Sequence, residues 1–335
     1  MTMRKNISIL LLCILFGTSC SNDFDLTTNW KDVTVVYGLL DPTQTSQYIR
    51  IEKAFLDEST SALTLAQNAD SLYYNTLSVE LEEIVLGGTG NVISLTRVDA
   101  NLEGFQREDG IFATSPNYVY KTDEALNQDA RYKLIINKDD GNQVTAETDI
   151  AQEFTITAPP GNVTELNFRT DNPDGTNVFR WTLEPNNKFF EFIFDIHIRE
   201  APLSDPTNFT DRTLKWVVND NIVPAANESL VRVELARSAF HEFMASSLEE
   251  GFVREFVSMD MIVSAGGSDL LEYINVGQAN AGITGADIVP IYTNLSEGGL
   301  GVLSTRISTS RTGFDINGLT LDSLQNGYRT RNLGF

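Results

Sequence analysis

Two histidines and 46 acidic residues are the side chains of this 335-residue sequence that could do acid–base chemistry. A Ser/His/Asp arrangement requires a histidine, and the sequence offers His197 and His241. His197 lies on the polar side of an alternating segment and His241 follows Phe240 in a helical pattern, as structural histidines commonly do. The sequence contains neither a GxSxG nor an HExxH motif. We therefore expect no histidine-dependent catalysis.

Paired carboxylates could hydrolyse a glycosidic bond, and neighbouring acidic residues are frequent in this sequence. The candidate groups are Glu80, Glu82 and Glu83, then Asp139 with Asp140, and Glu249 with Glu250. Because acidic residues are so common, no pair stands out, and the solvated side of a strand explains Glu80 and Glu82 equally well. We expect that the protein is not an enzyme, with a carboxylate-dependent hydrolase as the alternative.

Three short segments have some features of ligand-binding loops. Residues 87–90 and 298–301 are rich in glycine but lack the lysine of a phosphate-binding loop. Residues 171–175 would place Pro173 and Gly175 where a calcium loop needs oxygen ligands. All three segments are better explained as turns, so we expect no metal and no cofactor.

Aromatic side chains could bind a carbohydrate or a peptide by stacking. Trp216, which lies between Lys215 and Val217, is the candidate ligand-binding residue. Tryptophan also packs in the cores of β-sandwiches, so the sequence leaves both roles open for this residue.

Cys20 has the clearest chemical signature in the chain. Arg4 and Lys5 precede a short apolar segment, residues 7–16, and the small residues 17–19 stand directly before the cysteine. The apolar segment is too short to span a bilayer, so we expect residues 1–19 to be a lipoprotein signal peptide. Cys20 would then carry the acyl chains, and residues 20–31 would form a lipidated tether to the membrane. An ordinary secretory signal with an incidental cysteine is the alternative.

Charge and cysteine content restrict the partners and the bonds of the mature chain. Lys and Arg number 24 against 46 Asp and Glu, which gives a net charge of -22 and a surface that repels nucleic acid. We therefore expect no nucleic-acid partner. Cys13 would be removed with the signal peptide, and the acylated Cys20 cannot form a disulfide, so the mature fold should depend on packing.

The elements that must position these residues are mostly strands. Short alternating or β-branched segments recur between residues 33 and 157, which predicts an immunoglobulin-like β-sandwich over residues 32–158. Pro159, Pro160 and Gly161 mark a boundary. We expect a second, mostly β domain over residues 162–335, with two or three inserted helices at 236–249, 269–278 and 319–325.

Several segments together carry a family resemblance. They are the Cys20 signal with its acidic tether, residues 35–57, residues 146–148 with 156–160, and residues 292–294 with 298–306. With these segments the chain resembles uncharacterised lipoproteins of Bacteroidota, with a domain of unknown function, that are often found beside TonB-dependent receptors. The resemblance implies a β-rich envelope lipoprotein with such a receptor as its partner, and it implies no catalytic residues.

From these observations we expect an outer-membrane lipoprotein, lipid-anchored at the cell surface or on the periplasmic face. Its expected role is that of a non-enzymatic accessory or binding component of the cell envelope, and the resemblance implies a TonB-dependent receptor as its partner. The alternatives are the envelope hydrolase with paired carboxylates and a purely structural surface lipoprotein.

Overall fold

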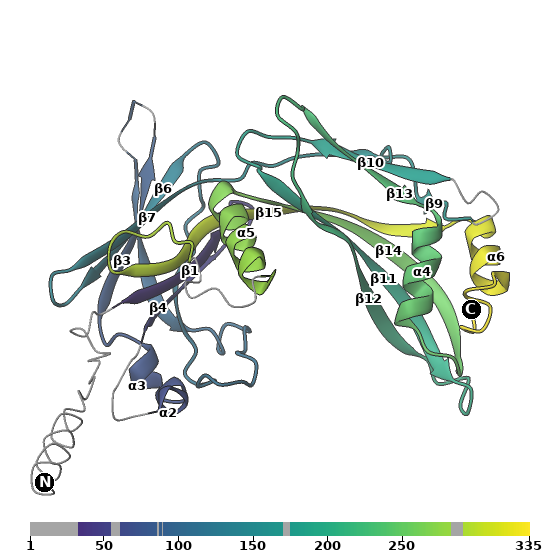
Figure 1. Cartoon of the computed structure of the whole chain (residues 1–335), viewed down its shortest axis with the longest axis horizontal. Coiled ribbons are helices and arrows are strands. Elements are labelled where there is room, and N and C mark those ends of the chain that lie inside the picture. The colour runs from purple at the N-terminus through teal and green to yellow at the C-terminus, as the bar shows by residue number, and fades with distance from the viewer. Residues whose placement is uncertain (1–32, 55–60, 86, 89, 170–174, 283–290) are drawn as a thin grey trace, which may run out of the picture.

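The computed structural model describes residues 33–54, 61–85, 87–88, 90–169, 175–282 and 291–335. The predicted signal peptide and tether, residues 1–31, lie outside these ranges, as does most of the predicted turn at 171–175. The prediction of a mainly β fold with a few short helices is confirmed. Figure 1 shows two β-rich parts side by side, with one long strand, β15 (Gly299–Ile316), running through both.

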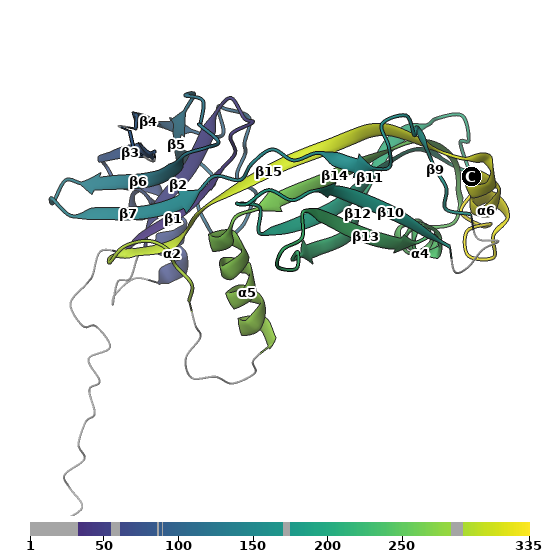
Figure 2. The same cartoon turned by 90° about the horizontal axis from the view of Figure 1, so that it is seen from above.

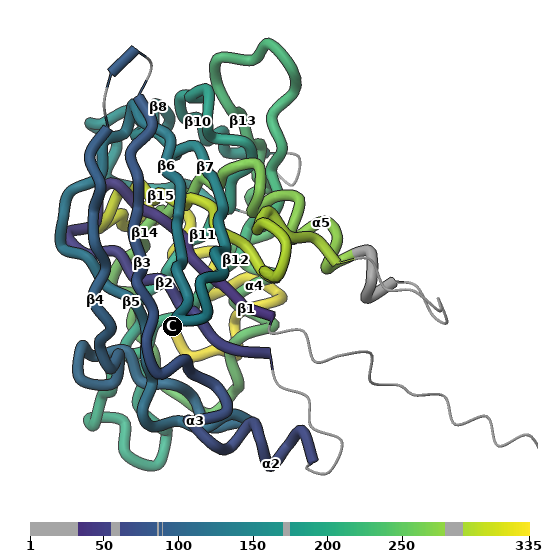
Figure 3. The backbone as a smooth tube through the Cα atoms, turned by 90° about the vertical axis from the view of Figure 1, so that its left-hand side faces the viewer, coloured from purple at the N-terminus to yellow at the C-terminus, as the bar shows by residue number. Residues whose placement is uncertain are grey.

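Seven strands and two short helices build the first part. They are β1 (Thr34–Leu40), β2 (Gln47–Lys53), α2 (Ala62–Ala66), α3 (Ala69–Leu72), β3 (Leu77–Ile84), β4 (Val92–Asp99), β5 (Tyr118–Thr122), β6 (Arg131–Lys138) and β7 (Gln143–Asp149). The strands follow the order β1-β2-β5-β4-β3-β6-β7. Figure 3 shows them around a common interior, seen from the end of the molecule.

Strand β4 makes this sheet fold back on itself. Its first half pairs with β3 and its second half, from Thr96 onward, pairs with β5. Alternating apolar residues therefore meet across one interior, where Ile49 and Ile51 of β2 pack in one core with Leu134 of β6. The remaining side closes where Leu295 forms a bridge to Ala146 of β7.

The second part holds the longer strands. Its elements are β8 (Ile156–Ala158), β9 (Glu165–Leu166), β10 (Thr176–Thr182), β11 (Phe189–Pro202), β12 (Thr210–Ile222), β13 (Leu230–Ala236), α4 (Ser238–Ser247), β14 (Phe252–Gly266), α5 (Ser268–Gly282), β15 and α6 (Gly318–Asn326). Strands β12-β11-β14-β15 form one face, and the three-stranded sheet β13-β10-β8 forms another. The three helices of this part match the three predicted ones in position.

The alternation predicted for residues 189–199 decides how these two sheets pack. Phe190, Phe192 and Phe194 of β11 are fully buried. Phe192 contacts Trp181 and Phe179 of β10, with ring centroids 5.7 and 5.1 Å apart. Because each of these rings removes a large apolar area from water, this aromatic layer is a major source of stability in the second part.

Strand β15 connects the two parts through backbone pairing. Its first seven residues pair in parallel with β1, and residues from Arg306 onward pair antiparallel with β14. Leu303 of β15, together with Leu295, belongs to the core of the first part. No local pattern in the sequence indicates this long-range pairing. The predicted boundaries 32–158 and 162–335 remain a prediction.

Helix α5 lies at the junction of the two parts, where it projects beside β15 (Figure 2). Among the residues that the structure describes, no helix combines the length and the apolar character needed to cross a membrane.

Candidate functional site

A cleft of about 530 Å³ opens on the outer face of the first part. Residues of β1, β2, β5 and β15 form its floor, and the 99–117 segment and α5 form its walls. The lining residues used below are Tyr37, Leu39, Tyr48, Arg50, Phe105, Arg107, Asn117, Leu270 and Tyr273. This volume lies within the range of small-molecule binding sites.

The apolar character of the cleft follows from the sequence of β1. Val36 and Leu40 point into the core, and by the two-residue period of a strand Tyr37 and Leu39 point outward. These two outward side chains are 44% and 40% exposed, which is unusual for large apolar residues in the middle of a sheet. The cleft floor is therefore an apolar surface that the described residues cover only in part.

Aromatic contacts shape the two sides of the cleft. Tyr37 meets Tyr273 of α5 edge to face, with ring centroids 6.3 Å apart. Tyr48 meets Phe105 of the 99–117 segment in the same way at 5.2 Å. Edge-to-face pairs are a favourable geometry for aromatic rings, so strands, segment and helix are held together around the cleft.

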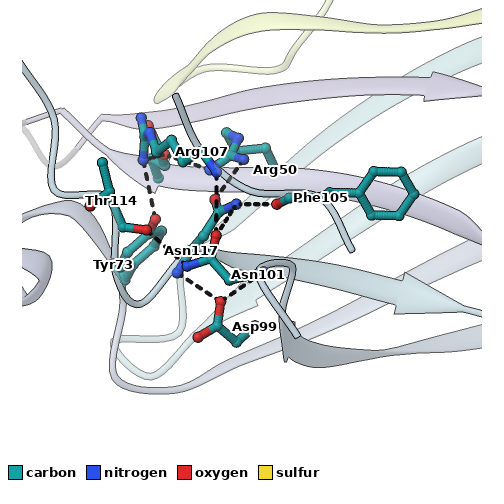
Figure 4. A network of polar contacts seen from close by, with 9 residues as sticks. Arg50, Tyr73, Asp99, Asn101, Phe105, Arg107, Thr114 and Asn117 are labelled. Atoms are coloured by element: carbon teal, nitrogen blue, oxygen red, sulfur yellow. Dashed lines mark hydrogen bonds and ion pairs between the residues drawn. The ribbon is translucent and has the colours of Figure 1, made fainter. Parts of the chain in front are cut away.

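Asn117 organises the 99–117 segment from inside. Its side chain is buried, its Oδ1 accepts a hydrogen bond from Arg50 Nη2 at 2.8 Å, and its Nδ2 donates to the carbonyl of Phe105 at 3.0 Å. Its backbone N–H donates to Asp99 Oδ1 at 3.0 Å. Figure 4 shows Asn117 at the centre of this network, between Asp99 and Arg50. The network fixes the position of one cleft wall.

Two arginines share one carboxylate at the polar end of the cleft. Arg50 and Arg107 donate from Nη1 to the same Oε1 of Glu52, at 3.2 and 3.0 Å. Arg107 also donates to the hydroxyl of Tyr73 at 3.2 Å. The side chains of Arg107 and Glu52 are only 16% and 12% exposed, so solvent screens this cluster less than a surface ion pair.

Tyr37 and Tyr73, which lie beside Glu52, remain neutral in the physiological range because the pKa of each is raised. Burial, with a hydrogen bond and a charge interaction with Tyr273, raises the pKa of Tyr37 to about 12. Burial also raises the pKa of Tyr73, and the negative charge of Glu52 adds to the effect. Neutral phenols add no negative charge, so the two guanidinium groups outweigh the single carboxylate of Glu52.

The predicted ligand-binding residue, Trp216, lies elsewhere. It is 7% exposed and stacks on Phe243 of α4 with ring centroids 5.4 Å apart. The ring of Phe194 also packs against Trp216, with ring centroids 5.6 Å apart. An indole packed on several sides has little surface to offer a ligand, so this placement lends no support to a binding role.

The residues considered for catalysis are not brought together. Asp139, Asp140, Glu249 and Glu250 are exposed, and Glu80 and Glu82 are half-buried on β3. Glu83 is buried and accepts a hydrogen bond from Asn127 Nδ2 at 2.7 Å. His197 hydrogen-bonds Thr213 and Asp260 on the outside of the second part. His241 is buried and its Nε2–H donates to the carbonyl of Phe168 at 2.7 Å. None of these residues lines the cleft.

Sequence reasoning missed the cleft residues. Arg50 could have been noticed as an outward residue of an alternating strand, but Arg107 stands in a segment without periodicity. The predicted lipidation residue, Cys20, lies outside the described residues. Within the described ranges, no group of three or more His, Cys, Asp or Glu side chains could hold a metal ion.

The fold and the cleft define a mainly β protein with a partly covered apolar cleft on its first part. The chain belongs to the DUF4249 family, described as a domain of unknown function, whose model matches residues 22–312. No curated protein matches this chain.

Two solved structures show distant similarity to this chain. The C-terminal globular domain of an oligosaccharyltransferase from Pyrococcus abyssi is 8% identical over 70% of this chain, with a TM-score of 0.22. This chain spans about half, 47%, of that domain. The calcium-binding domain CBD12 of CALX1.1 is 9% identical, with 81% of this chain and 98% of that chain covered and a TM-score of 0.14. Similarity at this level carries no functional argument.

Proposed function

We propose that this chain is a non-enzymatic binding component of the cell envelope, anchored to the outer membrane through lipid on Cys20. The observation that carries the binding role is the cleft, where outward Tyr37 and Leu39 lie beside the Arg50–Glu52–Arg107 cluster. Apolar walls with a few convergent polar groups are typical of ligand sites. The candidate catalytic residues lie outside the cleft, which favours binding over hydrolysis.

The proposed anchor is tested by two cysteine variants. Cys20→Ala should move the chain from the membrane fraction to the soluble fraction, because a surface with this excess of acidic residues is repelled by anionic lipid. Cys13→Ala is the matched control and should remain in the membrane fraction with its acyl label. If Cys20→Ala stays with the membrane after a high-salt wash, lipid on Cys20 is not the sole anchor.

The proposed partner is a TonB-dependent receptor, and the proposed setting is a Bacteroidota envelope. The support is the resemblance carried by the signal, the acidic tether and the segments at 35–57, 146–148 with 156–160, and 292–294 with 298–306. Affinity capture of the tagged chain from detergent-solubilised membranes should recover an outer-membrane receptor. Capture that yields the tagged chain without any receptor would contradict this partner and leave the anchor prediction intact.

A further inference from the structure

We propose that the cleft binds an amphipathic carboxylate, in which one carboxylate group is attached to an apolar or aromatic body. Arg107 would hold the carboxylate, with the positive charge of Arg50 nearby, and the aromatic wall would hold the body. This inference rests on the proposed binding role of the cleft and adds the chemical class of its ligand.

The charge of the cluster points to an anion. Among the residues that the structure describes, Glu52 is the only carboxylate within ion-pair distance of Arg50 or Arg107. Two guanidinium groups against one carboxylate leave a local positive charge in a chain whose net charge is -22. Acidic residues outnumber basic ones in this chain, so a cluster of charged side chains formed by chance would more often be negative.

Arg107 has donors left for a ligand. Its Nη1 serves Glu52 and Tyr73, whereas its Nε and Nη2 have no hydrogen-bond partner among the described residues. Neither atom is buried, so both remain accessible to a ligand. A guanidinium edge with two parallel N–H groups matches the two oxygens of a carboxylate.

The body of the ligand is defined by the surface beside this edge. Tyr37, Leu39 and Phe105 are 44%, 40% and 58% exposed and line the same cleft as the arginines. Leu270 and Tyr273 of α5 form the facing wall. Covering these side chains would remove apolar surface from water, which a purely ionic ligand such as inorganic phosphate would not achieve.

Two sources supply this chemistry: the free C-terminus of a peptide and a fatty acid. N-acetyl-Leu-Phe and octanoate represent them, and the amide of each keeps the body while removing the charge. We would measure binding by isothermal titration calorimetry to the mature chain carrying Cys20→Ala, so that no detergent competes for the apolar ligands.

N-acetyl-Leu-Phe, octanoate or both should bind at least about tenfold more tightly than the corresponding amide, because the amide loses the charged hydrogen bonds. Arg107→Gln should abolish this preference. Arg131→Gln is the matched control, since Arg131 pairs with Glu147 and Asp149 at 3.7 Å on β6, away from the cleft, and should keep it. The acid that binds more tightly identifies the source.

Three results would overturn the inference: equal affinity for acid and amide, absence of binding by all four probes, or a preference that survives Arg107→Gln. The wild-type comparison stands even if Arg107→Gln fails to fold. If the chain captures a receptor but shows no preference for the acid, the ligand class is wrong and the proposed function stands. If the chain prefers the acid but captures no receptor, the ligand class stands and the proposed receptor partner is wrong.

Discussion

The side-chain oxygen of Asn117 accepts a hydrogen bond from the guanidinium of Arg50 at 2.8 Å, and this bond ties the floor of the cleft to its wall. Arg50 belongs to β2, whereas Asn117 ends the segment that begins at Asp99. Asn117 is 1% exposed, so its polar atoms depend on protein partners rather than on water.

Asn117→Ala should lower the free energy of unfolding by about 1–3 kcal/mol, because the guanidinium of Arg50 and the carbonyl of Phe105 lose their partner. Urea denaturation would measure the change. Asn326→Ala is the matched control: Asn326 is exposed and bonds Asp322 within α6, so its replacement should have a much smaller effect. Equal losses in the two variants would contradict the role given to Asn117.

His241 should make stability depend on pH. Burial lowers its pKa, although the hydrogen bond to the carbonyl of Phe168 opposes this. The unfolded chain therefore takes up the proton at a higher pH than the folded chain, and stability is lost as pH falls below the ordinary value of 6.5. Protonation would also charge a buried ring whose Nδ1 has no described partner.

The free energy of unfolding, followed between about pH 7.5 and 5.5, should consequently decrease in the wild type. His241→Gln should flatten this dependence, since a glutamine amide carries no titrating group and still donates to a carbonyl. The matched control Ser246→Ala changes an exposed residue of the same helix that carries no titrating group, and it should retain the wild-type slope. An unchanged slope in His241→Gln would refute the assignment.

Gly301→Ala should disturb the pairing of β15 with β1. Gly301 has φ +101°, and an added Cβ would lie 2.1 Å from the carbonyl oxygen of Val36 on β1. Gly313 on the same strand has φ +76° but open space around it. Its replacement by alanine isolates the conformational cost of about 1–2 kcal/mol.

The expected loss for Gly301→Ala exceeds that of Gly313→Ala by about 1–3 kcal/mol, the cost of forcing atoms into a packed site. Thermal and urea denaturation of both variants would give this difference. Similar losses in both would mean that β1 and β15 separate easily at this point.

Trp216→Ala should lower the free energy of unfolding by about 3–5 kcal/mol, because it leaves a cavity between Phe243 and Phe194. Val217→Ala, one residue further on β12, removes a side chain that is 46% exposed and should change stability by no more than about 0.5 kcal/mol. Urea denaturation distinguishes the two. A small effect of Trp216→Ala would reopen the question of a ligand role.

Local patterns in the sequence already determined much of the second part. The alternation of residues 189–199 placed Phe190, Phe192 and Phe194 on one side of a strand, and the structure buries all three. Helical spacing likewise located α4, where Phe240 and Met244 are buried. Such patterns work because the period of a strand or a helix decides which neighbours share a face.

Only the tertiary structure decided what those faces meet. Thr305 Oγ1 donates to the carbonyl of Leu40, 265 residues away in the chain, in the region where β15 joins the first part. The cleft arises in the same way, since Arg50, Arg107 and Tyr273 come from a strand, an irregular segment and a helix. Periodicity reports only on near neighbours in sequence, whereas strand pairing and cleft walls depend on long-range contacts that no local pattern encodes.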